Sequence, residues 1–275
     1  KAYQPLITAI PDMERRDFIM MAGHSNGGNW VGCAGHYVGT FEKPWLDIPA
    51  TKHLVYMRYH EFFKLENGKI VEMQALWDIP QVMMQANAWS MSPSLAVEWI
   101  VPSLATNDGI ITTPYNETQG NASIQLVMDM LKGLERNNEG VEAMGLDKYW
   151  HPKFNWYGSA GIGASYTIPR YQEQHQLPFR ENLTDKVFNG HIARFSEGNY
   201  AGFFGWPNLN NKNKGGFLGL PASDANAPMR VVDIYRREGD KLAENWVYID
   251  ILHYLYEQGL DVLKRMRQIN RTIGF

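Results

Sequence analysis

The sequence predicts an α+β protein that consists of two tandem modules, each with an antiparallel sheet. Three observations carry this prediction: an internal repeat, an alternating strand pattern around a hairpin turn in each copy, and an amphipathic helix at the front of the second copy. Since a chain of 275 residues is long enough for two domains, one module per copy fits its length.

The composition is typical of a globular chain and excludes two classes of partner. Apolar residues make up 44% and charged residues 20% of the sequence, close to the average for folded domains. The 26 Lys and Arg residues against 29 Asp and Glu residues give a net charge of -3, so no basic field is available for nucleic acid. No apolar run approaches the roughly 18 residues of a membrane helix. We therefore expect neither a nucleic acid nor a membrane as partner.

The single cysteine and the scattered histidines bear on redox state and metals. Cys33 cannot form an intramolecular disulfide, which favours a reducing compartment such as the cytoplasm. His151, His175 and His191 lack the spacing of a metal site. The sequence therefore predicts a metal-independent protein.

An internal repeat organises the chain. Six positions recur 172 residues later: Met57, Arg58, Glu66, Lys69, Glu72 and Asp78 return as Met229, Arg230, Glu238, Lys241, Glu244 and Asp250. Further upstream, Gly28, Gly32 and Gly35 return at an offset of 170 as Gly198, Gly202 and Gly205. A two-residue loop insertion explains the change of offset, so both copies are expected to share one fold.

Each copy has the pattern of an antiparallel meander. In the first copy, alternating residues 54–65 and 69–78 flank a turn at Asn67-Gly68, a strong hairpin signal. In the second copy, residues 230–237 and 241–250 flank Gly239-Asp240. A third run precedes each hairpin, at residues 17–35 and 186–205.

Residues 88–115 are predicted to connect the modules. Pro93, Pro102, Pro114 and Asn107-Asp108-Gly109 interrupt this segment, which favours a linker with a short helix at residues 95–101. The predicted domains are residues 1–87 for the first module and residues 116–275 for the second.

The second copy has helices at its front that the first copy lacks. Apolar residues at helical spacing predict a helix over residues 124–134, capped by Asn121 or Ser123. Shorter helices are expected near residues 141–149, 169–175 and 251–256. Because Tyr3-Gln4 already corresponds to Tyr171-Gln172, we expect the first module to be incomplete at its N-terminal side. Either about half a module precedes Lys1, or residues 88–115 or a partner chain cover the exposed sheet face. Such a partner would form a homodimer through sheet packing.

Two groups of residues carry a resemblance to a known family. The copies end on Gly68-Lys69-Ile70-Val71-Glu72 with Trp77-Asp78, and on residues 241–246 with Asp250. The second copy also contains Trp156-Tyr157-Gly158, Gly161-Ile162-Gly163 and Pro178-Phe179-Arg180. In this order, the segments resemble SnoaL-like polyketide cyclases.

The resemblance implies the nuclear transport factor 2-like fold. In each module a curved antiparallel sheet would wrap around helices as a cone with a pocket inside. It also implies cofactor-independent acid/base chemistry, because family cyclases use a carboxylate at the end of the long strand for an intramolecular aldol closure. Asp78 and Asp250 occupy that position.

Strand alternation indicates a ligand-binding face in the second copy. Glu244, Trp246, Tyr248 and Asp250 share one face of their strand. Two acids and two aromatic rings suit a flat ligand rich in carbonyl groups, and an apolar pocket would raise the pKa of Asp250. In the alternative interpretation, Trp246 and Tyr248 are core residues and Asp250 caps the helix that follows it.

The equivalent face of the first copy offers further candidates. Glu72 and Asp78 recur there, and His60 is expected to lie near Asp78 as a His/Asp pair. Arg58 and Arg230 recur at equal positions, either to bind a carboxylate or enolate or to pair with Glu72 and Glu244.

These observations define the predicted site and function. The catalytic candidates are Asp250, Asp78 and His60; the substrate-binding candidates are Trp246, Tyr248, Glu244, Arg230, Trp156, His191, Arg58 and Glu72. The predicted function is aldol cyclisation or isomerisation of a hydrophobic, carbonyl-containing small molecule, without a cofactor or metal. The alternative is a non-catalytic small-molecule-binding or assembly module of the same fold.

Overall fold

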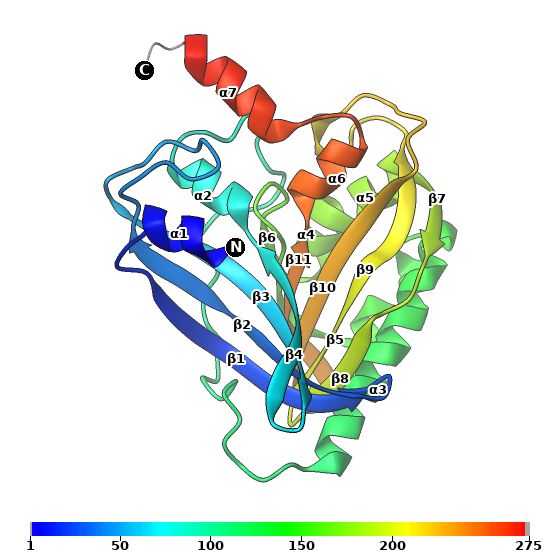
Figure 1. The fold of residues 1–275 in the computed structure, drawn as a ribbon. Coiled ribbons are helices and arrows are strands. Elements are labelled where there is room, and N and C mark those ends of the chain that lie inside the picture. Colours follow the sequence, from blue (N-terminus) through cyan, green and yellow to red (C-terminus); the bar gives the residue numbers. More distant parts are fainter. Residues whose placement is uncertain (1, 273–275) are drawn as a thin grey trace.

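The computed structural model describes residues 2–272 and contains two curved sheets that pack against each other (Figure 1). The first sheet is an antiparallel meander in the order β1-β2-β3-β4. Its strands are β1 (Glu14–Ser25), β2 (Gly28–Thr40), β3 (Leu54–Glu66) and β4 (Lys69–Trp77). The short helices α1 (Tyr3–Ala9) and α2 (Ile79–Gln85) accompany this sheet.

The second sheet is larger and has the order β6-β5-β11-β10-β9-β7, with β8 paired to β9. Its neighbours are antiparallel except for β5 and β11, which run parallel. The strands are β5 (Trp150–Tyr157), β6 (Ala164–Tyr166), β7 (Leu183–Phe188), β8 (Ala193–Glu197), β9 (Tyr200–Asn213), β10 (Ala227–Glu238) and β11 (Lys241–Ile249). The predicted α+β class with two tandem modules is confirmed.

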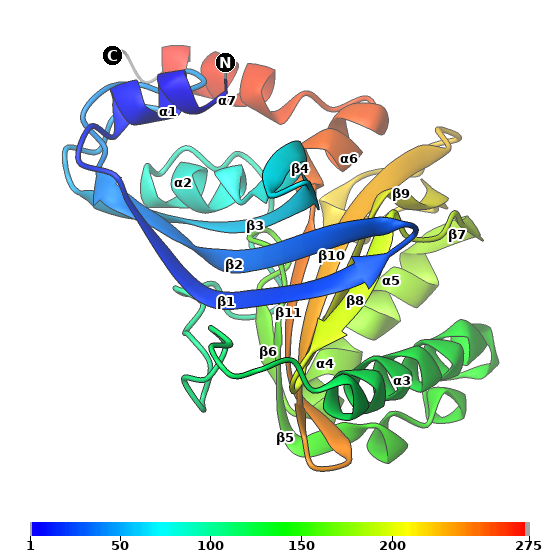
Figure 2. The ribbon, with the colours of Figure 1, turned by 60° about the horizontal axis from the view of Figure 1, so that its bottom comes forward.

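The helices at the front of the second module lie on one side of its sheet. Figure 2 shows the second sheet between the first sheet and the helices α3 (Glu117–Leu134), α4 (Ile168–Tyr171) and α5 (Leu177–Asn182). A π-helical turn, Gln172–Gln176, joins α4 to α5. The chain ends with α6 (Ile251–Glu257) and α7 (Val262–Thr272). No helix among the described residues combines the length and apolar character needed to cross a membrane.

The strand registers reproduce the sequence repeat. In the first module, β3 and β4 pair from Tyr59↔Trp77 to Lys64↔Glu72. In the second, β10 and β11 pair from Val231↔Ile249 to Arg236↔Glu244, which is the same register 172 residues later. Both hairpins also shift register immediately after this stretch. The two copies therefore have the same hairpin, including its irregularity.

Two large sheet faces bury each other at the junction between the modules. The first sheet contributes Ile19, Met21, Trp30, Ala34, Phe62 and Leu76, and the second contributes Phe195, Phe204, Val232, Ile234, Trp246 and Tyr248. The rings of Phe62 and Phe204 have centroids 4.4 Å apart. Gly32 has no room for a side chain, because a Cβ there would lie 2.9 Å from Phe62 and 3.2 Å from Phe195. Sheet-to-sheet packing thus occurs within this chain.

Arg58 anchors the first module to the second. Its fully buried guanidinium donates hydrogen bonds to the carbonyl oxygens of Tyr157 (3.0 Å), Gly158 (2.7 Å) and Val247 (3.0 Å). The same group lies 3.5 Å from Asp78, which in turn accepts from the backbone N–H of Ala160 at 3.1 Å. The prediction that Arg58 forms an ion pair with Glu72 is therefore wrong. The arginine instead pairs with the acid that ends the neighbouring strand.

Three local predictions differ from the structure. Residues 17–35 do not form one run: β1 and β2 fold as a hairpin around Asn26-Gly27. Residues 186–205 likewise span β7, β8 and β9. Residues 95–101 form no helix, and Val97 forms a bridge to Ala164 instead, since the flanking prolines favour an extended chain.

The start of α3 also differs from the prediction. Asn116 is the N-cap, and its Oδ1 accepts from the backbone N–H of Gln119 at 3.0 Å. Asn121 and Ser123, the predicted caps, lie inside the helix. The helix begins earlier because residues 117–123 contain no residue that prevents it, although they lack the apolar periodicity from which the start was inferred.

The outer face of the first sheet is covered in part by its own module. Leu6 of α1 and the segment with Phe41, Trp45 and Ile48 pack on this face around Met57. Farther along the face, Ile70 and Val71 are 62% and 53% exposed. Val101 and Leu104, from the predicted linker, pack into the junction between the sheets instead. The domain limits at residues 87 and 116 and the homodimer stay predictions.

Candidate functional site

A cavity of about 350 Å³ lies in the second module, on the sheet face that points away from the first module. The floor is formed by alternate residues of two strands: Val231, Asp233 and Tyr235 of β10, and Asn245, Val247 and Ile249 of β11. Helix α3 contributes Met128, Leu131 and Leu134 to the opposite wall. This volume is typical of a small-molecule site. We call it the Asp233 cavity.

Asp233 is the acid in the floor of this cavity. Its Oδ1 accepts hydrogen bonds from the hydroxyl of Tyr235 (3.0 Å) and from Nδ2 of Asn245 (3.3 Å). Burial raises the pKa of Asp233 to about 6, although the hydrogen bonds from Asn245 and Tyr235 act in the opposite direction. Such a carboxyl group can both accept and return a proton near neutral pH.

The neighbours of Asp233 fix its orientation. Nδ2 of Asn245 also donates to the backbone oxygen of Ile234 at 3.2 Å. Burial holds the pKa of Tyr235 well above its usual value, so its hydroxyl remains a donor. Among the described residues, no hydrogen bond reaches the second oxygen of Asp233, Oδ2. This oxygen is therefore the one available to a ligand.

Basic side chains lie at the edge of the Asp233 cavity. Lys186 and Arg194 both line it, and Nζ of Lys186 donates to the backbone oxygen of Phe179 at 3.2 Å. Burial, assisted by the charges of Lys214 and Arg180, lowers the pKa of Lys186 to about 8. The cavity thus combines a buried acid with cationic groups that can stabilise negative charge on a ligand.

Two histidines form aromatic parts of the wall. The ring of His191 stacks on Phe203, with centroids 3.9 Å apart, and burial together with the charge of Arg194 lowers its pKa to about 4. His175 stacks on Trp156 at 4.1 Å, and burial lowers its pKa to about 3. Both imidazoles are therefore neutral at pH 7 and offer flat surfaces to a ligand.

Metal ligands are not gathered in this cavity. Asp233, Glu135, His175 and His191 line it, but nowhere in residues 2–272 do three or more His, Cys, Asp or Glu side chains form a group that could hold a metal ion.

Two of the predicted substrate-binding residues, Trp156 and His191, line the Asp233 cavity. Trp246, Tyr248 and Glu244 lie on the opposite face of β11, which is buried against the first module. Tyr248 donates to the backbone oxygen of Trp77 at 2.5 Å, and Glu244 accepts from Nε of Arg236 at 2.5 Å. Their predicted place in the pocket needs correction, because both faces of this sheet are covered and the aromatic face is the one that holds the modules together.

Asp250 caps the helix that follows it, as the alternative interpretation predicted. It is the N-cap of α6, and its Oδ1 accepts from the backbone N–H of His253 at 3.2 Å. Its Oδ2 lies 3.4 Å from Arg230, whose side chain is 40% exposed. Neither Asp250 nor Arg230 lines the Asp233 cavity.

The candidates of the first copy lie in or near the junction. Asp78 is 1% exposed, and burial raises its pKa to about 6. His60 is fully buried, and neither ring nitrogen has a hydrogen-bond partner among the described residues. The predicted His60/Asp78 pair does not form; the ring of His60 faces Tyr248, with centroids 6.1 Å apart. Glu72 accepts from Gln74 at 2.6 Å.

Sequence reasoning missed Asp233, Tyr235, Asn245 and Lys186. A signal for the first of these was present, because Glu61 plus the repeat offset of 172 gives Asp233. Alternation along the strand also separates Asp233 and Tyr235 from Val232 and Ile234. The acid that recurs in the middle of the strand, Glu61 in β3 and Asp233 in β10, therefore indicated which strand face lines the cavity.

The comparisons with known proteins include one family match, which covers the first module. Residues 1–86 match the model of the SnoaL-like polyketide cyclase family. No curated protein matches the chain. Similar solved structures include a SnoaL-like polyketide cyclase from Jannaschia sp. CCS1, with 14% identity and a TM-score of 0.43 over 53% of this chain and 97% of that one. TsrD from Streptomyces laurentii has 21% identity and a TM-score of 0.39 over 49% of this chain and 96% of its own. A protein with a ketosteroid isomerase-like fold from Catenulispora acidiphila, in complex with trimethylamine, has 9% identity and a TM-score of 0.35 over 48% and 94%.

Proposed function

Because residues 1–86 match the SnoaL-like polyketide cyclase family and the second copy repeats their strand register, we propose an acid/base function for the second module. Its Asp233 cavity binds a hydrophobic, carbonyl-containing small molecule and transfers protons on it without a cofactor. One observation carries this proposal: a buried carboxyl group with a pKa of about 6 lies in the floor of a cavity of about 350 Å³.

The reaction begins with Asp233 in its ionised form. Oδ2 removes a proton from a carbon next to a carbonyl group, which leaves an enolate and a neutral Asp233. The enolate carbon then attacks a second carbonyl of the same molecule, and Asp233 returns its proton to the new alkoxide. This sequence is an aldol cyclisation. Return of the proton to a different carbon gives an isomerisation instead.

The other cavity residues support these steps. Lys186 and Arg194 stabilise the negative charge of the enolate. Tyr235 and Asn245 donate to Oδ1, which directs Oδ2 toward the substrate. The apolar side chains of α3 exclude water, so the intermediate is not protonated by solvent.

Deuterium exchange tests this function without knowledge of the natural substrate. Acetylacetone has an acidic C–H between two carbonyl groups, and its enzyme-dependent exchange in D₂O can be followed by proton NMR. We expect exchange above the buffer rate with the wild-type chain and loss of this excess with Asp233→Asn. Asp250→Asn is the matched control, because asparagine also caps helices well. Loss of exchange in the Asp250 variant alone would transfer the role to Asp250.

The first module supports the alternative function for that half of the chain. Glu61, its equivalent of Asp233, is fully buried and accepts from the hydroxyls of Tyr3 and Tyr37, both at 2.8 Å. Trp77 donates to the same oxygen at 2.9 Å, and Arg15 pairs with the other. With its acid enclosed in this way, we propose that the first module is a non-catalytic assembly module that covers the second sheet.

A further inference from the structure

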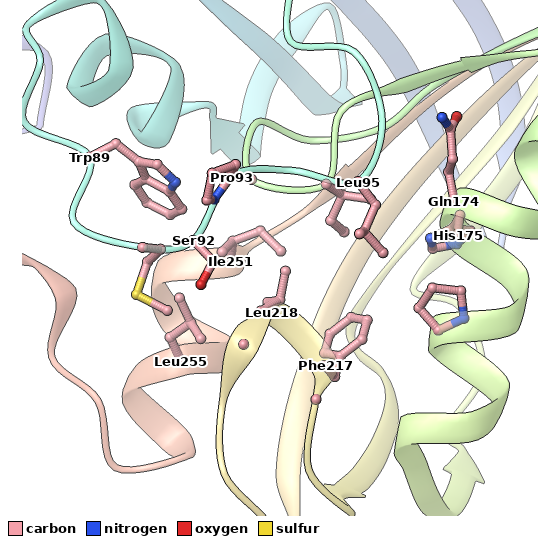
Figure 3. A pocket seen from close by; sticks show the side chains of 16 residues that line it. Trp89, Ser92, Pro93, Leu95, Gln174, His175, Phe217, Leu218, Ile251 and Leu255 are labelled. Carbon is pink, nitrogen blue, oxygen red and sulfur yellow. The ribbon is translucent and has the colours of Figure 1, made fainter.

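A second pocket opens beside the Asp233 cavity and has no part in the reaction described above. Its volume is about 220 Å³. Figure 3 shows its walls: Trp89, Ser92 and Leu95 from the segment between the modules, His175 from the π-helical turn, and Phe217 and Leu218 from a glycine-rich loop. We call this the outer pocket.

The segment that forms one wall of the outer pocket is held in place at several points. Ala96 donates to the backbone oxygen of Ile162 at 3.3 Å, and Glu98 accepts from the N–H of Gly161 at 2.8 Å. At the other end, Arg265 of α7 donates to the backbone oxygen of Ser90 at 2.9 Å. A wall that is fixed at both ends forms a preformed site, which suits ligand binding.

The opposite wall contains a strained residue. Leu218 has a φ of 55°, a left-handed conformation that is unfavourable for a leucine. In Figure 3 its side chain extends into the pocket, between Phe217 and Ile251. Strain of this kind persists where the surrounding structure requires it, and it is concentrated at ligand-binding sites.

His175 connects the two cavities, because its imidazole lines both of them. His175 is 8% exposed, and its Nδ1 has no hydrogen-bond partner among the described residues. A rotation of the ring therefore breaks no hydrogen bond at Nδ1, although it gives up the stack on Trp156. The turn that carries it is π-helical, a conformation frequent at functional sites.

Size and chemistry indicate what the outer pocket holds. Its volume of about 220 Å³ is below the usual range for a complete small-molecule site, whereas the Asp233 cavity reaches that range. Its lining is mostly apolar, with Trp89, Leu95, Phe217, Leu218, Ile251 and Leu255. A pocket of this kind suits one apolar part of a larger ligand.

We propose that the outer pocket binds an apolar tail, an alkyl chain or an aromatic ring, of the same molecule whose carbonyl group lies at Asp233. The tail passes His175, which is the wall common to both cavities. This inference rests on the proposed function and adds the shape of the substrate: a polar head with two carbonyl groups and an extended apolar end.

A homologous series of diketones tests the proposal. Acetylacetone is compared with homologues in which one terminal methyl group is replaced by a propyl, pentyl or heptyl chain, and dissociation constants are measured by calorimetry with the wild-type chain. We expect affinity to rise by up to about fourfold per added methylene group until the outer pocket is full. Affinity that does not depend on chain length would overturn the proposal.

Two variants locate the tail. Ser92→Phe fills the pocket from an exposed position, and we expect it to abolish the gain from the longer chains. Leu218→Gly removes an apolar contact and relieves the left-handed strain, so the chain should fold normally and bind the long homologues several-fold more weakly. Ser103→Phe, an exposed position outside both the Asp233 cavity and the outer pocket, is the matched control. If the gain persists in Ser92→Phe and Leu218→Gly, the tail lies elsewhere and the inference is wrong.

The two proposals fail in different ways. Deuterium exchange of acetylacetone, which has no tail, depends on the Asp233 cavity and not on the outer pocket, and calorimetry reports tail binding whether or not exchange occurs. Absence of exchange together with a chain-length effect that Ser92→Phe removes would refute the acid/base function and retain the tail site. Exchange without a chain-length effect would retain the function and refute the tail site.

Discussion

Glu61 and Asp233 occupy equivalent positions in the two modules, 172 residues apart. In the neighbouring strand, Glu61 pairs with Cys33 and Asp233 pairs with Phe203, so the two acids point to the same face of their sheets. Two tyrosines, Trp77 and Arg15 enclose Glu61. Among the described residues, only the side chains of Tyr235 and Asn245 donate to the carboxyl group of Asp233, which faces a cavity. The same strand position thus serves packing in one module and a ligand site in the other.

The first prediction concerns Arg58. Arg58→Met should lower the free energy of unfolding by about 3–5 kcal/mol, because Asp78 remains as an unpaired buried charge and three carbonyl groups lose their donor. Arg230→Met changes the equivalent residue of the second copy, which is 40% exposed, and should cost no more than about 1 kcal/mol. Urea denaturation of both variants measures the difference. Equal losses would show that Arg58 is not the anchor.

The second prediction concerns His60, whose pKa burial and the charge of Arg58 hold well below its usual 6.5. In the unfolded chain His60 gains a proton as the pH falls through 6.5, but in the folded chain it stays neutral. Its contribution therefore destabilises the fold at acidic pH, by about 2 kcal/mol between about pH 7 and pH 5.

His60→Met should remove this part of the acid sensitivity. The variant should also be at least as stable as the wild type at pH 7, because the ring nitrogens of His60 have no hydrogen-bond partner among the described residues. Denaturation curves at both pH values measure the effect, with the exposed His53→Met as control. A variant that loses as much stability on acidification as the wild type would contradict the prediction.

The third prediction concerns the pH dependence of the exchange reaction. Asp233 acts as a base only when ionised, so the rate should rise with pH and level off above about pH 6, the pKa of the group. In Tyr235→Phe the carboxylate loses a donor that lowers its pKa. The midpoint of the profile should therefore move to higher pH.

A matched control exists for this experiment. The hydroxyl of Tyr200 also donates to a carboxylate, that of Asp108, at 2.5 Å, but neither residue lines the Asp233 cavity or the outer pocket. Tyr200→Phe should leave the midpoint unchanged. A midpoint that does not respond to Tyr235→Phe, or that moves equally in Tyr200→Phe, would exclude Asp233 as the titrating base.

The fourth prediction concerns the start of α3. Asn116→Ala removes the hydrogen bond to the N–H of Gln119 and should cost about 1 kcal/mol of stability. Asn121→Ala, at an exposed position inside the helix, should be neutral or slightly stabilising because alanine is the better helix former. Thermal unfolding of the two variants distinguishes them. A larger loss in Asn121→Ala would place the cap where the sequence pattern alone had placed it.

Local patterns in the sequence were sufficient for the repeat and for the hairpin that recurs in each copy, and they offered the N-cap at Asp250 as an alternative to a catalytic role. Asn67-Gly68 forms its turn because both residues tolerate a positive φ, 51° and 73° in the structure. The offset of 172 survives as an identical strand register. Side-chain alternation also divided β11 correctly into two faces, with Trp246 and Tyr248 on one and Asn245 and Val247 on the other. Within each copy, the turn, the strand pairing and the alternation depend on residues that are close to one another in the chain.

Only the tertiary structure decided which face of that strand holds the cavity. The aromatic face of β11 would suit a pocket, but in this chain it meets the first sheet, where Phe62 packs on Phe204 and Arg58 reaches the backbone of Val247. Alternation separates two faces without specifying what covers either one. The cover comes from residues more than a hundred positions away, and their approach buried the aromatic face and left Asp233 beside the helices.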